Sequence, residues 1–210
     1  MTGFSGAGLE VSRETLERLK IYEETLHKWR SVKNLVSAST VREIWSRHFD
    51  DSLQLVKLAP SARTWVDIGS GAGFPGLVIA IVLANVEGSC AHLIESDNRK
   101  CAFLREVARL TQARAIVHHG RAEEIIPELE AADAVIARAV GPLQYLVDLA
   151  TPLLLRGAIG MFPKGRDYRS ELANLRLPGN FKVDTTPSLT ENGAAIVIVS
   201  GKASISVPKP

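Results

Sequence analysis

The stretch Asp67-Ile68-Gly69-Ser70-Gly71-Ala72-Gly73-Phe74-Pro75-Gly76 decides the fold of this chain. It follows a β-prone run, Thr64–Ile68, and opens a helix-like segment, Gly76–Ala84. Glycines allow positive φ angles in a turn, and without Cβ atoms the backbone can pass close beneath a ligand. A glycine-rich turn between a strand and a helix is the context in which cofactor loops occur. The stretch therefore predicts a cofactor loop, with close packing of a helix on a strand as the alternative.

Two cofactor motifs fit these same residues. The spacing Gly71-x-Gly73-x-x-Gly76 matches the dinucleotide fingerprint, and Glu95 lies about 20 residues further on, where an acid would bind a ribose. The spacing Asp67-x-Gly69-x-Gly71-x-Gly73 resembles motif I of the class I S-adenosylmethionine (SAM)-dependent methyltransferases. In both folds an acidic side chain at the end of the second strand holds ribose hydroxyls, so Glu95 is the expected ribose acid in either case.

Several features favour the methyltransferase pattern over that of an NAD-dependent dehydrogenase. Asp67 precedes the glycines, which the dinucleotide fingerprint does not require. The segment Gly120-Arg121-Ala122-Glu123-Glu124 resembles the methyltransferase loop that holds adenine. Two β-prone segments, Phe181–Thr185 and Ala194–Ser200, follow each other without a helix, as in the methyltransferase fold. The chain also leaves no further domain to position a hydride acceptor.

The order of elements predicts an α/β fold of the class I methyltransferase type, with a Rossmann-like, seven-stranded and mostly parallel sheet. An amphipathic helix is expected before the sheet, capped by Ser12, and a second helix is expected to begin at Thr40. The first of these carries apolar residues at helical spacing, namely Leu16, Leu19, Tyr22, Leu26 and Trp29. We expect an N-terminal helical extension over residues 1–60, a methyltransferase domain over 61–200 and a loose tail over 201–210.

The composition is that of a globular protein. The 210 residues are 46% hydrophobic and 23% charged, and 25 Lys+Arg against 23 Asp+Glu leave a formal charge of +2. This balance excludes a strongly basic packaging protein but allows a local basic face. The apolar run Leu77–Ala84 is far shorter than the roughly 20 residues of a membrane span, and no signal-peptide pattern is visible. Because Cys90 and Cys101 lack metal or redox spacing, we expect no metal site and no disulfide framework. We also expect a cytoplasmic protein that is monomeric and has no membrane partner.

The sequence lacks the residues that two classes of methyl acceptor require. Methylation at C5 of a pyrimidine needs a Cys nucleophile, usually in a Pro-Cys dipeptide, whereas Cys90 follows Ser89 and Cys101 lies in an expected helix. Methylation of an exocyclic amine usually relies on an Asn/Asp-Pro-Pro-aromatic loop, but residues 137–142 read Ala-Arg-Ala-Val-Gly-Pro. A ring nitrogen such as guanine N7 already carries a free lone pair, so the sequence agrees with that target.

The chain closely resembles the RsmG (glucose-inhibited division protein B) family from about Leu16 to Val199. The resemblance is carried by Gly69–Gly76 with Leu77–Ile81, Arg47-His48-Phe49 with Asp51-Ser52-Leu53, Arg121-Ala122-Glu123-Glu124, and Ala137-Arg138-Ala139. It implies methyl transfer from SAM to N7 of one guanine in bacterial 16S ribosomal RNA, free or in a small-subunit ribosomal particle. The expected cofactor contacts include the motif I glycines Gly69, Gly71 and Gly73. The others are Phe74, Glu95, Ala122, Glu123 and Arg138.

Basic segments on both sides of the expected sheet are candidates for RNA contact, with a solvated surface as the alternative. The candidates are Lys28, Arg30, Lys33, Arg47, Lys164 and Arg166. The first segment departs from the family, because Arg30 replaces the usual Asn and both Lys33 and Asp50 stand where apolar residues are common. These departures affect the expected RNA contacts rather than cofactor binding.

No catalytic residue can be assigned from the sequence, and the candidates are Arg138, Lys164 and His48. Arg138 and Lys164 each follow an expected strand, and the carboxyl ends of such strands face the site. His48 can reach Asp51 three residues further on, which makes a structural hydrogen bond the alternative to a site role. Because no catalytic dyad is visible, a non-catalytic SAM- or RNA-binding module is the alternative to an enzyme. A dehydrogenase is a further alternative.

Overall fold

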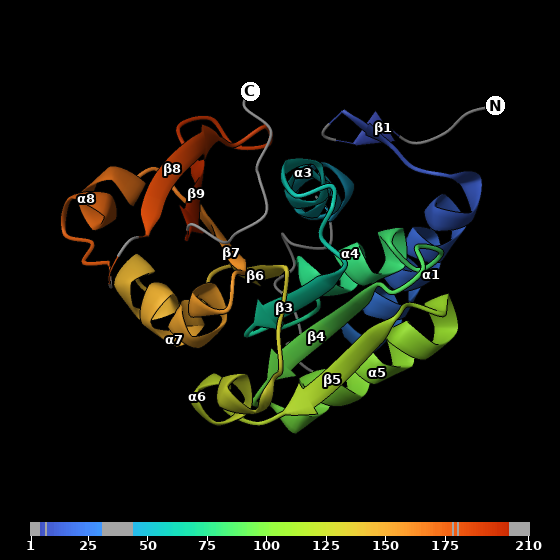
Figure 1. The fold of residues 1–210 in the computed structure, drawn as a ribbon. Coiled ribbons are helices and arrows are strands. Elements are labelled where there is room, and N and C mark those ends of the chain that lie inside the picture. Colours follow the sequence, from blue (N-terminus) through green and yellow to red (C-terminus); the bar gives the residue numbers. More distant parts are fainter. Residues whose placement is uncertain (1–4, 7, 31–43, 178, 180, 202–210) are drawn as a thin grey trace.

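The structure is a computed structural model that describes residues 5–6, 8–30, 44–177, 179 and 181–201. A seven-stranded sheet runs through its centre, with helices on both faces (Figure 1). The strand order is β5-β4-β3-β6-β7-β9-β8. The strands are β3 (Thr64–Ile68), β4 (Cys90–Glu95), β5 (Ala115–His119), β6 (Ala134–Ala137), β7 (Ile159–Lys164), β8 (Lys182–Pro187) and β9 (Ala195–Ser200).

Strands β3 to β7 are parallel, whereas β9 lies antiparallel to both β7 and β8. The apolar run Ala195–Ser200 suits the interior position of β9, whose first five residues are buried. Strand β8 carries Lys182 and Asp184 on exposed positions, as expected of an edge strand. The predicted seven-stranded, mostly parallel sheet with an antiparallel pair at one edge is therefore confirmed.

One face of the sheet is covered by α4 (Gly76–Val82), α5 (Asn98–Thr111) and α1 (Arg13–Arg30), and the other by α7 (Leu143–Leu155) and the short α6 (Ala122–Ile125) (Figure 1). A 3-10 turn, η2 (Ile126–Glu128), follows α6, and α8 (Tyr168–Ala173) follows β7. None of the helices among the described residues is long and apolar enough to cross a membrane.

The segment before the sheet is helical, as predicted, but not uniformly so. Helix α1 begins after Ser12, whose Oγ accepts a hydrogen bond from the Thr15 amide at 3.1 Å. The helix start expected at Thr40 lies outside the described residues. The described part begins as a π-helix, η1 (Ile44–Phe49), that continues into α3 (Asp50–Leu58). Two-residue strands, β1 (Ser5–Gly6) and β2 (Leu9–Glu10), form a hairpin beside α3 that the sequence pattern did not predict (Figure 1).

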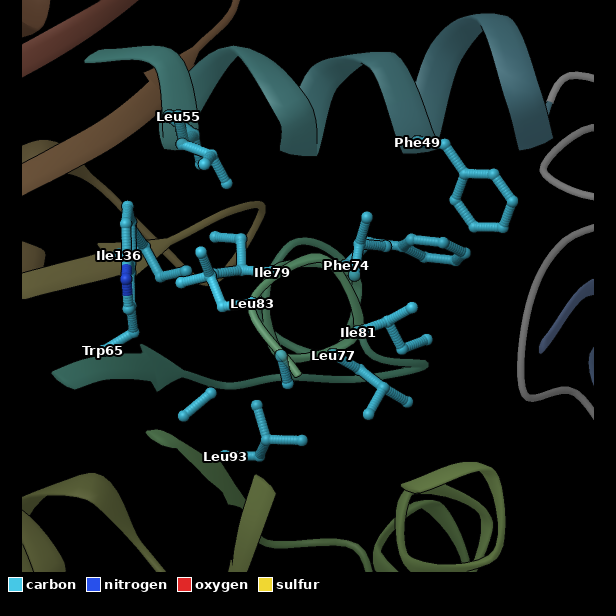
Figure 2. Close-up of a cluster of buried hydrophobic side chains, with 14 of the residues drawn as sticks. Phe49, Leu55, Trp65, Phe74, Leu77, Ile79, Ile81, Leu83, Leu93 and Ile136 are labelled. Atoms are coloured by element: carbon cyan, nitrogen blue, oxygen red, sulfur yellow. The ribbon is translucent and has the colours of Figure 1, made fainter. Parts of the chain in front are cut away.

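The hydrophobic core joins these N-terminal helices to the sheet. Helix α4 carries almost only apolar residues, and Figure 2 shows it surrounded by side chains on every side. Phe49 and Leu55 approach it from η1 and α3, while Trp65 and Leu93 approach from the strands. Because residues from both sides of position 60 share one buried cluster, the N-terminal helices are fixed beside the loop that precedes α4.

Candidate active site

The glycine loop between β3 and α4 is fixed by the buried carboxylate of Asp67. Asp67 Oδ2 accepts a hydrogen bond from the Gly76 amide at 3.1 Å, at the start of α4. Burial raises the pKa of Asp67 to about 6, and hydrogen bonds from Ser70 and Gly76 oppose that rise. Asp67 Oδ1 is buried and has no hydrogen-bond partner among the described residues. Such an orphaned acceptor costs free energy unless water or a ligand satisfies it.

The glycines of the loop serve two different purposes. A Cβ at Gly73 would lie 2.7 Å from Tyr22 Oη, and one at Gly76 would lie 2.5 Å from Asp67 Cβ, so both glycines allow close packing. A Cβ at Gly71 would approach only the Gly69 carbonyl oxygen, at 3.8 Å. Gly71 also has a positive φ of 58°. The backbone at Gly71 therefore borders space that the described residues do not fill, as a ligand-binding position requires.

Glu95 ends β4 beside this open space and is tied to the loop. Its Oε2 accepts a hydrogen bond from the Gly71 amide at 2.8 Å, and its Oε1 accepts one from the Asp97 amide at 2.8 Å. The side chain is buried. Each carboxylate oxygen has two lone pairs, so both can still accept a hydrogen bond from a ligand hydroxyl. This arrangement fits the predicted ribose contact.

Ala122 and Glu123 begin α6, after the carboxyl end of β5. Ala122 is half-buried and Glu123 is exposed. Tyr145 from α7 donates a hydrogen bond to Glu123 Oε1 at 2.7 Å. A backbone hydrogen bond at Glu123 and, to a smaller extent, this Tyr145 hydrogen bond lower the pKa of Glu123. Tyr145 was not a sequence candidate, because its spacing only suggests an outward position on a helix. It fixes the predicted adenine-binding turn to α7.

Phe74 connects the glycine loop to the N-terminal helices. Its ring stacks between those of Tyr22 and His48, with centroid distances of 5.3 and 4.8 Å. The Tyr22 hydroxyl donates to the Ala72 carbonyl oxygen, within the same loop. The guanidinium of Arg138 lies over the Phe74 ring, with its central carbon 5.7 Å from the ring centroid. The predicted cofactor residues Phe74 and Arg138 are thus in contact.

Arg138 is held by two residues from the N-terminal helices. Its Nη2 contacts His48 Nδ1 at 2.7 Å, and its Nη1 contacts Asp51 Oδ2 at 3.0 Å. Because a guanidinium can only donate, His48 Nδ1 is the acceptor and the imidazole proton is assigned to Nε2. The sequence predicted that His48 could reach Asp51; in the structure, Arg138 bridges the two. Asp51 Oδ1 accepts further hydrogen bonds from Gln54 and Thr190.

A pocket of about 570 Å³ opens next to Arg138, at the carboxyl ends of β6 and β7. Its lining contains similar numbers of cationic and acidic side chains, which makes it a polar pocket rather than a purely basic one. The cationic residues are Arg47, Arg138, Lys164 and Arg166, and the acidic ones are Asp51, Asp167, Glu171 and Glu191. His48 also lines it. All three candidate catalytic residues therefore meet in one pocket.

Lys164 is held in the pocket by two contacts within the protein. Its Nζ lies 2.8 Å from Glu171 Oε2 and donates to the Gly141 carbonyl oxygen at 3.0 Å. Only 12% of its side chain is exposed. Lys164 thus joins β7, α8 and the loop after β6. The carboxylate of Glu171 offsets the charge of Lys164 within the protein. Glu171 was not a sequence candidate, because a single acid on a short helix resembles a solvated surface residue.

The predicted RNA-binding residues are not all brought together. Arg47 and Arg166 are exposed at the pocket. Lys28 is exposed on α1 and does not line the pocket. Lys33 and the side chain of Arg30 lie outside the part of the chain that the structure describes.

The cysteines stand apart from the pocket. Cys101 is buried, and its Sγ donates to the Glu95 carbonyl oxygen at 3.3 Å. Burial raises the pKa of both Cys90 and Cys101, which disfavours the thiolate. Within the described ranges, no group of three or more His, Cys, Asp or Glu side chains is placed to hold a metal ion.

The order of the strands explains why two adjoining sites form. The chain crosses from β3 through β4 to β5 on one side and from β6 to β7 on the other, so the switch point lies between β3 and β6. The open loop and Glu95 lie at the ends of β3 and β4, and the polar pocket lies at the ends of β6 and β7. Arg138, directly after β6, borders both.

The fold and this site together define a class I SAM-dependent methyltransferase. The open backbone at Gly71, the adjacent carboxylate of Glu95 and the orphaned Asp67 Oδ1 fit a ligand that carries hydroxyl and ammonium groups. The family model for rRNA small subunit methyltransferase G matches residues 15–191, and the chain belongs to that family.

Individual relatives agree with this assignment. The "Ribosomal RNA small subunit methyltransferase G" of Methylobacterium radiotolerans is 48% identical over 95% of this chain and 94% of its own length. The protein of the same name from Rhodospirillum centenum is 51% identical over 92% of this chain and 88% of its own. A solved methyltransferase from Geobacter sulfurreducens shares the fold, with a TM-score of 0.58 and 11% identity over 87% of this chain and 89% of that one.

Proposed function

We propose that this enzyme transfers a methyl group from SAM to N7 of a guanine in 16S ribosomal RNA. The observation that carries the proposal is the position of Arg138, which contacts the cofactor loop through Phe74 and also lines the polar pocket. A cofactor site and a substrate pocket that share one residue suit a reaction in which two bound molecules must meet. Membership of the rRNA small subunit methyltransferase G family supports RNA as the substrate.

The residues of the loop would hold SAM in a defined orientation. Glu95 would accept hydrogen bonds from the ribose hydroxyls, Ala122 and Glu123 would border the adenine, and the backbone at Gly71 would pass beneath the ligand. When bound, SAM supplies an electrophilic methyl group on a sulfonium. The N7 lone pair forms the new N–C bond as the C–S bond breaks, which leaves a thioether and places a positive charge on the guanine.

The pocket chemistry agrees with a ring nitrogen as the acceptor. N7 of guanine carries no proton, so the protein needs neither a base to remove one nor a covalent nucleophile. Cys90 and Cys101, the sequence's two cysteines, do not line the pocket. The protein's contribution is then to exclude solvent and align the base, which can supply a large part of the rate enhancement.

We further propose that the substrate is 16S rRNA or a small-subunit particle, met in the cytoplasm by a monomeric enzyme that needs no metal. Arg47 and Arg166, exposed at the mouth of the pocket, are suited to contact RNA phosphates. Lys28 lies on a different part of the surface and would contact RNA only if the substrate extends along α1.

Transfer of tritiated methyl from SAM tests the enzymatic function. Small-subunit particles and naked 16S rRNA, both from cells deleted for the gene, serve as substrates, and Glu95→Ala serves as the impaired control. We expect incorporation into at least one of the two substrates with the wild-type protein. Binding of both SAM and RNA without incorporation would instead identify a non-catalytic module.

A further inference from the structure

We propose that Glu171 is the residue that reads the base, by accepting hydrogen bonds from the N1–H and N2–H₂ groups of the target guanine. This inference rests on the proposed function and deepens it. Enzymes that act on a single base take it into a pocket and read its Watson–Crick edge by hydrogen bonds. On that edge guanine presents two adjacent donors, and the two lone pairs of a single carboxylate oxygen can accept from both.

Glu171 is anchored so that one of its oxygens remains available. Its Oε2 accepts a hydrogen bond from the Leu143 amide, at the start of α7, and lies 2.8 Å from Lys164 Nζ. Its Oε1 has no hydrogen-bond partner among the described residues, and the side chain lines the pocket with 28% of its surface exposed. A carboxylate fixed through one oxygen and open at the other is positioned to accept from a ligand.

The other three pocket carboxylates are less suited to this role. Asp51 is occupied on both oxygens, by Arg138 on one side and by Gln54 and Thr190 on the other. Asp167 and Glu191 are exposed at the pocket, and no side-chain hydrogen bond fixes either carboxylate within the described residues. Recognition of a base requires groups held in place, because ordering a free side chain costs conformational entropy.

The geometry of guanine and the order of the strands agree with this assignment. N7 belongs to the five-membered ring, and the N1 and N2 donors lie on the opposite edge of the base. If N7 faces the cofactor site at β3, the opposite edge must face away from it, across β6 toward β7 and α8. Glu171 is on α8, beyond Lys164 of β7, and therefore lies on the side where the N1 and N2 donors would be.

This arrangement would discriminate among bases that all carry a methylatable N7. Adenine presents an acceptor at N1, which would face the Glu171 carboxylate without a hydrogen bond. Inosine keeps N1–H but lacks the N2 amino group. A site built to hydrogen-bond a donor disfavours an analogue that lacks it, because its own polar group is left unpaired.

The test compares RNA substrates with guanine or inosine at the mapped methylation site. For wild type and Glu171→Gln, kcat/KM for methyl transfer is measured along with RNA affinity in the presence of S-adenosylhomocysteine. We expect the wild type to prefer guanine by about 10- to 100-fold, the range for one hydrogen bond to a charged group. In Glu171→Gln the guanine-to-inosine ratio should fall to within about threefold of unity. Any change in RNA structure caused by inosine is common to all variants and cancels in the comparison.

Three controls separate the outcomes. Glu128→Gln, exposed on η2, should keep the wild-type ratio. Glu171→Asp retains the charge but draws the carboxylate oxygens back from the base, so it should also lower the guanine-to-inosine ratio. It replaces Glu171→Gln in the test if that variant fails to fold. The assignment is overturned if Glu171→Gln keeps the wild-type guanine-to-inosine ratio or loses kcat/KM equally on both substrates. It is also overturned if Glu191→Gln alone abolishes the preference for guanine. If the wild type methylates no guanine N7 at all, the proposed function fails instead.

Discussion

Arg138 Nη1 donates a hydrogen bond to Asp51 Oδ2 at 3.0 Å, across 87 positions of the chain. This contact ties α3, which precedes the sheet, to the loop that follows β6. Asp51 also accepts a hydrogen bond from Thr190, in the turn between β8 and β9. The N-terminal helices therefore build one wall of the pocket rather than only covering the sheet.

Replacing Asp51 should loosen three segments at once. Asp51→Ala removes the acceptor for Arg138, Gln54 and Thr190, and we expect the free energy of unfolding to fall by about 1–3 kcal/mol. Thr190→Val removes only one of these hydrogen bonds and should cost less. Urea unfolding of both variants checks the order. Equal stability of Asp51→Ala and wild type would show that this network contributes nothing to the fold.

The two roles of the loop glycines predict opposite phenotypes. Gly71→Leu directs a side chain into the open space, so the protein should fold, with a cost of about 1–2 kcal/mol for the left-handed backbone. Its affinity for S-adenosylhomocysteine should fall at least about tenfold, because the side chain would occupy space that the ligand needs. Gly73→Ala should lower the melting temperature instead, since its Cβ would clash with Tyr22 and Leu77. Calorimetric titration and thermal melts distinguish the two; unchanged affinity in a folded Gly71→Leu protein would exclude this loop from cofactor binding.

Glu95 should matter both for the ligand and for the loop. Glu95→Ala is expected to weaken SAM binding by about 1.5–3 kcal/mol, the range for hydrogen bonds to a charged group. The structure adds that Glu95 fixes the Gly71 amide, so part of this loss reflects a less ordered loop. Glu95→Gln can keep that bond through its amide oxygen and should bind SAM with intermediate affinity. Calorimetry that found Glu95→Ala equal to wild type would exclude the ribose contact.

Asp67 should make stability depend on pH. Its pKa is raised to about 6 in the folded protein, whereas an unfolded Asp titrates near about 3.9. Between these values the folded state binds more protons than the unfolded state, so this group's contribution to stability falls as pH rises from about 4 to 6 and is constant above. Asp67→Asn lacks this titration. The stability of wild type minus that of Asp67→Asn should fall by roughly 1–3 kcal/mol across the window. A difference that does not change with pH would show that the Asp67 pKa is not raised.

Much of the fold follows from local pattern. The strand Thr64–Ile68 occurs with the predicted bounds, and the segments predicted at Gly76–Ala84, Phe181–Thr185 and Ala194–Ser200 occur with ends shifted by at most two residues. Apolar periodicity and bounding glycines or prolines are local signals, which is why these elements could be predicted. The two-residue strands β1 and β2 carry no such pattern. Nor did the sequence show that Tyr22 would reach the Ala72 carbonyl, 50 positions away.

The candidate site was predictable only where a motif is contiguous. The motif located the glycine loop, and strand spacing located Glu95. The partners of Arg138, His48 and Asp51, lie in the helical segment before the sheet. Helical periodicity predicts such a segment but does not predict which distant residue its side chains contact. Glu171 gave no signal, because its role depends on Lys164 and on the Leu143 amide, which the fold alone brings together.

The central claim is tested most directly by mapping N7-methylguanine in 16S rRNA. The rRNA is taken from cells with and without the gene, and from deleted cells complemented with wild type or with Glu95→Ala, and is cleaved chemically at N7-methylated positions. We predict one guanine-specific cleavage that disappears on deletion, returns with wild type and stays weak with Glu95→Ala. An identical cleavage pattern with and without the gene would contradict the account.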